Sequence, residues 1–93
     1  MLTGLAALAD TLAVASAVGV DRDAALELIK AGPLVGAVPR AVSKGAVFPV
    51  SLAERDMGLA LAELGNAPAP VARATARALH DARDRSADLA SIV

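Results

Sequence analysis

The sequence predicts a small all-α protein, a bundle of helices. The chain has 93 residues, which is enough for one domain (1–93) but only marginally enough to bury a core of its own. Apolar residues make up 56% of it, alanine and leucine dominate, and Phe48 is the one aromatic residue. This composition suits close helix–helix packing and gives little support to strands, which favour β-branched and aromatic side chains.

Residues 1–20 are almost wholly apolar and predict a first helix that Gly19 ends. A membrane span is the alternative, but the carboxylate of Asp10 at mid-span would cost about 2.5–3.5 kcal/mol on insertion. A signal peptide is disfavoured because no basic residue precedes Arg22. We therefore expect an interior helix that other parts of the protein cover on most faces, and no membrane partner.

The next segments carry clear start and stop signals. Asp21 is expected to cap a helix over 22–31, which Gly32-Pro33 terminates. Because a proline deep inside a helix removes a hydrogen bond, residues 33–37 and 40–43 are expected to form two short helical pieces with a kink at Pro39.

A capping box predicts the start of the following helix. Ser51 and Glu54 have the spacing at which each side chain bonds the other's backbone N–H, so the helix should begin at Leu52 and stop at Gly65. Its first turn would carry Arg55 and Asp56, an adjacent pair facing different directions.

The C-terminal third predicts one more helix and a tail. Pro70 is well placed as the first residue of that helix. A charged break follows over 82–86, and the apolar residues 88–93 are expected to dock on the bundle.

The charges and reactive residues exclude several function classes. A net charge of −1 with acids and bases interspersed argues against nucleic acid and anionic membranes as partners. The lack of cysteine excludes thiolate chemistry and fits a cytoplasmic location. We find no Ser-His-Asp arrangement, metal-ligand cluster or glycine-rich phosphate loop, so no residue is assigned as catalytic or as a metal ligand. The one histidine, His80, is interpreted as a surface imidazole, with a proton shuttle as the alternative.

A family resemblance adds to this reading. Phe48, Leu52, Arg55-Asp56 and Leu59-Ala60 resemble the F…L..KD..LA motif of the β-hydroxyacid dehydrogenases, the 3-hydroxyisobutyrate dehydrogenase-like family. Further pieces fall in the family's order over nearly the whole chain: Asp10, Gly19-Val20-Asp21, Ala31-Gly32-Pro33, Pro70 and Asp88-Leu89-x-x-Ile92. The resemblance implies the helical C-terminal domain of such an enzyme, a bundle similar to the 6-phosphogluconate dehydrogenase-like C-terminal domain.

The resemblance also implies site residues. The family's GxGxxG dinucleotide-binding domain has no counterpart in this chain, and the family's catalytic lysine would fall before Met1. Arg55 occupies the place of a family lysine that reaches the nicotinamide cofactor, NAD or NADP; a solvated helix charge is the alternative. Phe48 occupies the place of a phenylalanine near the mouth of the substrate pocket, and the alternative is a plain core aromatic.

Two functions follow as hypotheses. The first is the C-terminal domain of an NAD(P)-dependent 3-hydroxyacid dehydrogenase-like oxidoreductase, which shapes the cleft, mediates dimerisation and is inactive alone. Its partner would be a second copy, a higher homo-oligomer or a dinucleotide-binding domain, because so much apolar surface in so small a chain needs covering. The second is a stand-alone helical dimerisation or protein-binding module without catalysis.

Overall fold

Helices make up the regular structure of the part of the chain that the computed structural model describes, residues 1–43 and 45–93. Within those residues there is no strand, and a single isolated bridge pairs Pro49 with Asp88. The prediction of an all-α protein is confirmed. In chain order the elements are α1 (Leu2–Ala17), α2 (Arg22–Ile29), the 3₁₀ turn η1 (Val35–Ala37), α3 (Val38–Ala41), α4 (Val50–Leu64), α5 (Pro70–His80) and the 3₁₀ turn η2 (Leu89–Ile92).

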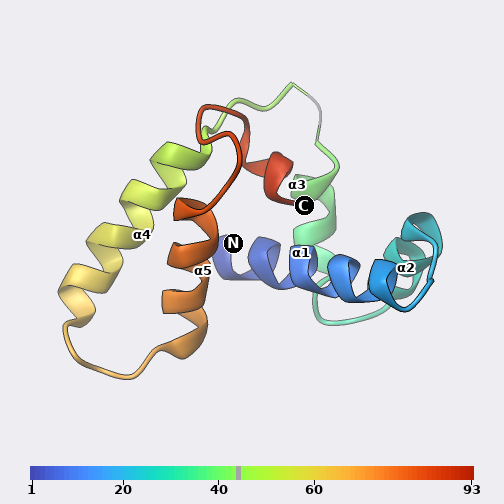
Figure 1. The fold of residues 1–93 in the computed structure, drawn as a ribbon, viewed down its shortest axis with the longest axis horizontal. Coiled ribbons are helices and arrows are strands. Elements are labelled where there is room, and N and C mark those ends of the chain that lie inside the picture. The colour runs from blue at the N-terminus through green and yellow to red at the C-terminus, as the bar shows by residue number, and fades with distance from the viewer. Residues whose placement is uncertain (44) are drawn as a thin grey trace.

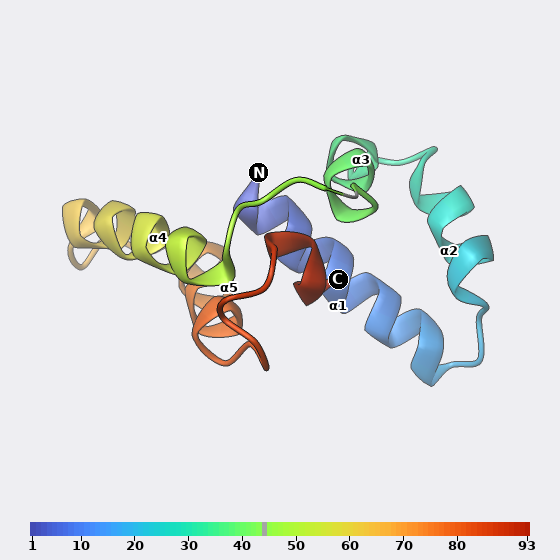
Figure 2. The same cartoon turned by 90° about the horizontal axis from the view of Figure 1, so that it is seen from above.

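The helix α1 is the element on which the others assemble (Figure 1). It contacts α2, α3, α5 and η2, while α4 packs on α5 as a helical hairpin. Seen from above, the α4–α5 pair lies toward the N-terminal end of α1, and α2 lies toward its C-terminal end (Figure 2). The C-terminal turn η2 comes back to lie over the middle of the molecule, close to α3.

Two small clusters of buried side chains form the core. The first joins α1 to the α4–α5 hairpin and to η2, and its buried members are Leu5, Val50, Ala53, Met57, Leu79 and Leu89. The second joins α1 to α2 and α3, and its buried members are Leu8, Leu12, Ala25 and Val38. The radius of gyration is 13.6 Å, against about 12 Å for an average domain of this length. The bundle is therefore open, with apolar surface left uncovered.

Several boundaries follow the local signals in the sequence. The Asp21 carboxylate caps α2, accepting from the backbone N–H groups of Asp23 and Ala24 at 3.1 and 3.2 Å. Pro70 is the first residue of α5. Gly65 follows α4 directly and Gly19 lies two residues after the end of α1, and both have positive φ, 62° and 85°, a conformation that L side chains rarely adopt.

The predicted capping box is wrong. The helix α4 begins at Val50 after Pro49, and no side chain bonds its N-terminus. The free N–H groups are satisfied from elsewhere: Val50 N donates to the carbonyl of Ala87 and Ser51 N to that of Arg85, at 2.9 and 2.8 Å. Tertiary contacts with the C-terminal segment thus replace the local cap.

Two other expectations need correction. Pro39 lies in the first turn of α3, which follows η1 directly, and a proline costs no hydrogen bond there because first-turn N–H groups have no intrahelical partner. The first helix is not covered on most faces. Its buried residues Leu5, Leu8 and Leu12 lie on one side, and Val14 is 63% exposed.

The tail prediction is confirmed, since Leu89 is fully buried in the first core cluster. No helix in the described part of the chain combines the length and apolar character needed to cross a membrane.

Candidate functional site

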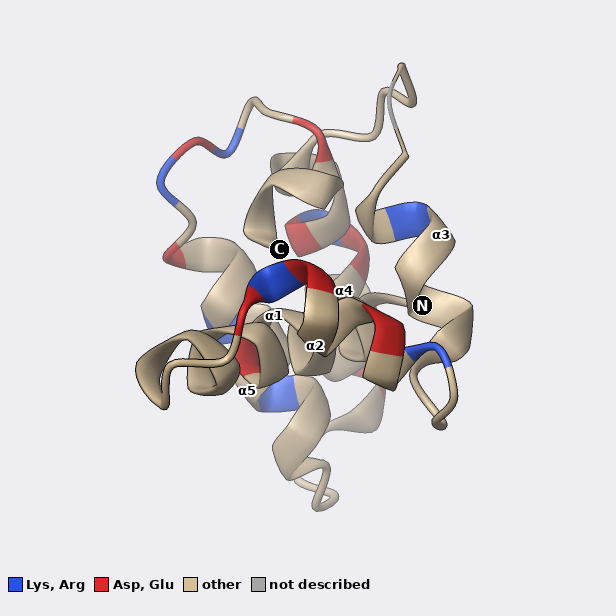
Figure 3. Ribbon diagram, turned by 90° about the vertical axis from the view of Figure 1, so that its right-hand side faces the viewer, with Lys and Arg blue, Asp and Glu red and all other residues tan. Residues whose placement is uncertain are grey.

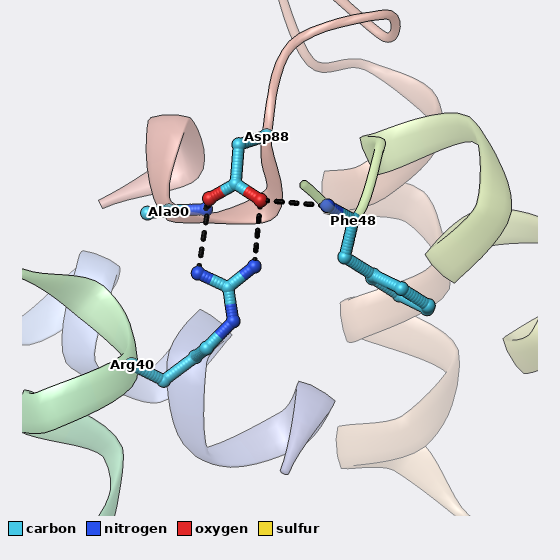
Figure 4. Close-up of polar contacts among 4 residues, drawn as sticks. All are labelled: Arg40, Phe48, Asp88 and Ala90. Carbon is cyan, nitrogen blue, oxygen red and sulfur yellow. Dashed lines mark hydrogen bonds and ion pairs between the residues drawn. The ribbon is translucent and has the colours of Figure 1, made fainter. Parts of the chain in front are cut away.

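The most densely bonded group in the structure is the carboxylate of Asp88, at the start of η2 (Figure 4). Arg40 of α3 donates to it from both terminal guanidinium nitrogens, Nη2 to Oδ1 at 2.7 Å and Nη1 to Oδ2 at 2.9 Å. Backbone N–H groups of Phe48 and Ala90 donate to the same two oxygens at 2.9 and 3.0 Å. We call these four residues the Asp88 junction.

The Asp88 junction fixes the charge of its carboxylate. The Arg40 guanidinium, followed by the N–H groups of Ala90 and Phe48, holds the pKa of Asp88 far below its ordinary value. In return, the hydrogen bond to Asp88 raises the pKa of Arg40. With four donors on two oxygens and so low a pKa, Asp88 is a poor proton acceptor at neutral pH, and its role is to hold segments together.

A second polar cluster ties α4 to the end of α5. The Glu54 carboxylate contacts Nδ1 of His80 at 2.7 Å through one oxygen and accepts from the Arg85 guanidinium through the other. The hydrogen bond from His80, and then that from Arg85, lowers the pKa of Glu54. Because an ionised carboxylate only accepts, Nδ1 of His80 carries the proton in this contact. The side chain predicted to close a capping box therefore joins two helices and a loop instead.

The predicted site residues lie apart from any enclosed pocket. The Arg55 side chain is 67% exposed in the second turn of α4, and its Nη2 lies 3.3 Å from Oδ1 of Asp56, so the two neighbours face each other rather than different directions. Phe48 is half-buried and packs against the first core cluster, with its N–H bonded to Asp88. The structure brings Phe48 to the Asp88 junction and leaves Arg55 in solvent.

Two adjoining cavities, about 380 and 320 Å³ in volume, lie between α1 and α5. Both are lined by Ala6, Asp10 and Ala78, so they form one surface, which we call the α1–α5 groove. Alanine is its commonest lining residue, and neither Phe48 nor Arg55 contributes to it. The groove is a mostly apolar surface whose lining also includes the carboxylates of Asp10 and Asp84 and the guanidinium of Arg83.

Some of the charges in and beside the groove have no partner, whereas Asp84 accepts from the backbone N–H and the hydroxyl of Ser86. In the described part of the chain, Asp10 on α1, Arg77 on α5 and Arg83 after α5 form no ion pair or side-chain hydrogen bond. Arg83 lines the groove beside Asp10, and Arg77 lines the adjacent outer face of α5 together with Ala78. Elsewhere, acidic and basic positions alternate along the ribbon without a stretch of one sign (Figure 3).

Reasoning from the sequence missed the Asp88 junction and the groove. Asp88 was placed in the docking tail, although an aspartate before a short turn is a familiar capping residue, and that signal was available. Its bond to Arg40 links residues 48 positions apart, and no local pattern reports such a contact. No pattern of neighbouring residues predicts the groove either, because the way α5 packs on α1 decides which side of α5 faces the core.

The described residues contain no group of three or more His, Asp or Glu side chains placed to hold a metal ion. Comparison with protein-family models, with curated proteins and with solved structures finds no significant match to the chain.

Proposed function

We propose that the chain is the helical substrate and association domain of an NAD(P)-dependent 3-hydroxyacid dehydrogenase-like oxidoreductase. One observation carries this proposal. Phe48 opens the F…L..KD..LA-like motif, and Asp88-Leu89 begins the separate family-like piece at the end of the chain. The two are hydrogen bonded in the fold: Phe48 N donates to Asp88, and Leu89 N donates to the Phe48 carbonyl at 2.8 Å. The contact between these two pieces, 40 residues apart in the chain, is what a single architecture shared with the family would require, and it supports the proposal.

In this role the Asp88 junction is a positioning device. It fixes the segment before α4, so the first turns of α4 present Arg55 in a constant direction. Among the described residues, the partner of this exposed guanidinium is the exposed carboxylate of its neighbour, which leaves it available to the ribose or phosphate oxygens of a cofactor held by another domain. The nicotinamide cofactor would supply the hydride acceptor for oxidation of a 3-hydroxy acid, and the lysine that acts on the substrate oxygen would come from the dinucleotide-binding part.

The chain by itself is then expected to bind cofactor weakly and to show no turnover, because the main binding contacts lie in the other domain. The experiment mixes the purified chain with NAD⁺ or NADP⁺ and a panel of 3-hydroxy acids, with and without a separately produced dinucleotide-binding domain of this family. Formation of reduced nicotinamide is expected only in the presence of that domain.

Two variants sharpen this test. Arg55→Glu should raise the KM for cofactor about tenfold or more, as expected for loss of one charge-assisted contact. Lys30→Glu reverses an exposed charge on α2, breaks only a surface pair with Glu27, and should leave the KM unchanged. Turnover by the chain alone, or equal behaviour of the two variants, would contradict the proposal.

A stand-alone association module is the second candidate, and the exposed apolar side of α1 favours it. This candidate predicts dimerisation without any response to a dinucleotide-binding domain. The mass of the intact native polypeptide and the reading frame upstream of Met1 separate the two: a GxGxxG motif and the family's catalytic lysine upstream support the first candidate, and a native polypeptide of 93 residues supports the second.

A further inference from the structure

We propose that α4 has two alternative starts and that the C-terminal segment over residues 85–93, which we call the C-terminal strap, selects between them. With the strap docked, as in the structure, α4 begins at Val50. With the strap undocked, α4 begins at Leu52 behind a capping box of Ser51 and Glu54. This inference does not depend on the proposed function, because it concerns only the local structure at the start of α4.

Arg85 of the strap engages both partners of the capping box that the structure does not form. Its backbone carbonyl accepts the Ser51 N–H at 2.8 Å. That N–H is the group which the glutamate side chain of a capping box bonds. The Arg85 guanidinium donates to Oε2 of Glu54, so the side chain that would reach back to Ser51 is bonded elsewhere. One residue of the strap thereby blocks both halves of a local structure that the sequence encodes.

The docked strap supplies its own acceptors to the start of α4. In Figure 1 the strap, red, runs past the green start of that helix. No side chain caps α4. Every backbone N–H over residues 48–51 donates to the strap, since Pro49 has none; the acceptors are Asp88, Ala87 and Arg85. Because a helix leaves its first N–H groups without intrahelical partners, undocking frees all of them together.

The strap is held in place by few side chains. Of residues 85–93, Leu89 alone is buried, and the bidentate pair with Arg40 is the main polar anchor. The regular structure of the strap is limited to the short turn η2. Segments with so few buried contacts open locally at a lower free energy than the whole fold. The strap is therefore able to undock while the rest of the bundle stays folded.

Undocking releases every group that the capping box needs. The Ser51 N–H loses the carbonyl of Arg85, and Oε2 of Glu54 loses the guanidinium. When Val50 leaves the helix, the Glu54 N–H loses its intrahelical acceptor and becomes free for the Ser51 hydroxyl. The two side chains then bond each other's backbone N–H groups. The helix is shortened to Leu52 and does not unravel further.

Hydrogen exchange in Ser51→Ala tests the two starts. The substitution removes the capping hydroxyl from the undocked state and leaves the docked state unchanged, since no side chain caps α4 there. Undocking should therefore become less favourable, and the amides of Val50, Leu89 and Ala90 should exchange about fivefold more slowly, the ratio expected of one capping residue. Ser16→Ala changes an exposed serine of α1 and is the matched control, which should leave these rates unchanged.

Exchange of the unsubstituted chain in low denaturant first establishes how the strap opens. The amides of Val50, Leu89 and Ala90 should open together at a free energy below that of global unfolding, while amides over residues 55–58 stay protected. Slower exchange in Ser51→Ala then supports the two starts, and unchanged or faster exchange overturns the second start. Separate opening of Val50 and Leu89, or opening only together with the whole chain, overturns the strap.

Discussion

The Asp88 junction and the α1–α5 groove both place charged side chains where separate segments meet, but they differ in how those charges are satisfied. At the junction, each carboxylate oxygen of Asp88 receives one bond from Arg40 and one from a backbone N–H. In the groove, Asp10 has no bonded partner among the described residues, although Arg83 lines the same cavity. The contrast is between a junction that closes the fold through paired charges and a groove in which the Asp10 carboxylate has no partner among the described residues.

The junction matters for the fold because it holds three distant segments. It joins α3, the segment before α4 and the C-terminal turn, and so brings Leu89 into the first core cluster. The polar contacts and the buried leucine act together.

Leu89→Ala should cause the largest loss of stability. Leu89 is fully buried, and removing its side chain leaves a cavity that costs about 2–5 kcal/mol of unfolding free energy. Val14→Ala, on the exposed side of α1, should change the unfolding free energy of the monomer by less than about 0.5 kcal/mol. Denaturant unfolding at low protein concentration measures both, and equal effects would mean that Leu89 does not anchor the fold.

Arg40→Met and Asp88→Asn should show strong non-additivity. Each single substitution leaves a charge or a set of donors without its partner, whereas the double variant removes both charges together. We expect each single substitution to lower the melting temperature by several degrees, which is less than the decrease that Leu89→Ala causes. The double variant should lower it by less than the two single decreases added together. Additive changes in melting temperature would mean that the ion pair contributes little.

Acid should destabilise the fold through the same carboxylate. The pKa of Asp88 is lowered in the fold, so its stabilising contribution is complete above the ordinary aspartate pKa of about 4 and is lost as the pH falls below that value. The pKa of Glu54 is also lowered and acts in the same direction. Unfolding free energy measured at decreasing pH should therefore decline, and Asp88→Asn should flatten the decline. An unchanged slope would contradict this assignment.

Ser51→Ala should have the smallest effect. A true capping residue costs about 1 kcal/mol when replaced by alanine. Here the N-terminus of α4 is bonded by carbonyls of the C-terminal segment, so we expect a change below about 0.5 kcal/mol. A loss as large as that expected of Asp21→Ala, which removes the observed cap of α2, would restore the capping-box interpretation.

Several helix boundaries could be predicted from local signals in the sequence. Asp21, Gly19, Gly65 and Pro70 mark helix boundaries through their own backbone or side-chain chemistry, so each was predictable from a few neighbouring residues. The capping box failed because α4 begins at Val50, which places the Glu54 N–H inside the helix, and because the carbonyl of Arg85 accepts the Ser51 N–H that Glu54 was expected to bond.

The same distinction applies to the candidate site. Phe48 was singled out from the sequence, and it reaches the Asp88 junction through its backbone rather than its ring. The partner of Asp88, Arg40, was not predicted, because side-chain pairs across 48 residues depend on how helices pack. The extent of exposed surface on α1 is likewise a property of the assembled bundle.

Hydrogen exchange at two protein concentrations tests the proposed association role most directly. On raising the concentration, amides of α1 over residues 3–17 should gain protection. Those of Phe48, Leu89 and Ala90 should not change beyond the general stabilisation that association brings. Extra protection centred on the Asp88 junction, or the same gain along the whole chain, would contradict the account.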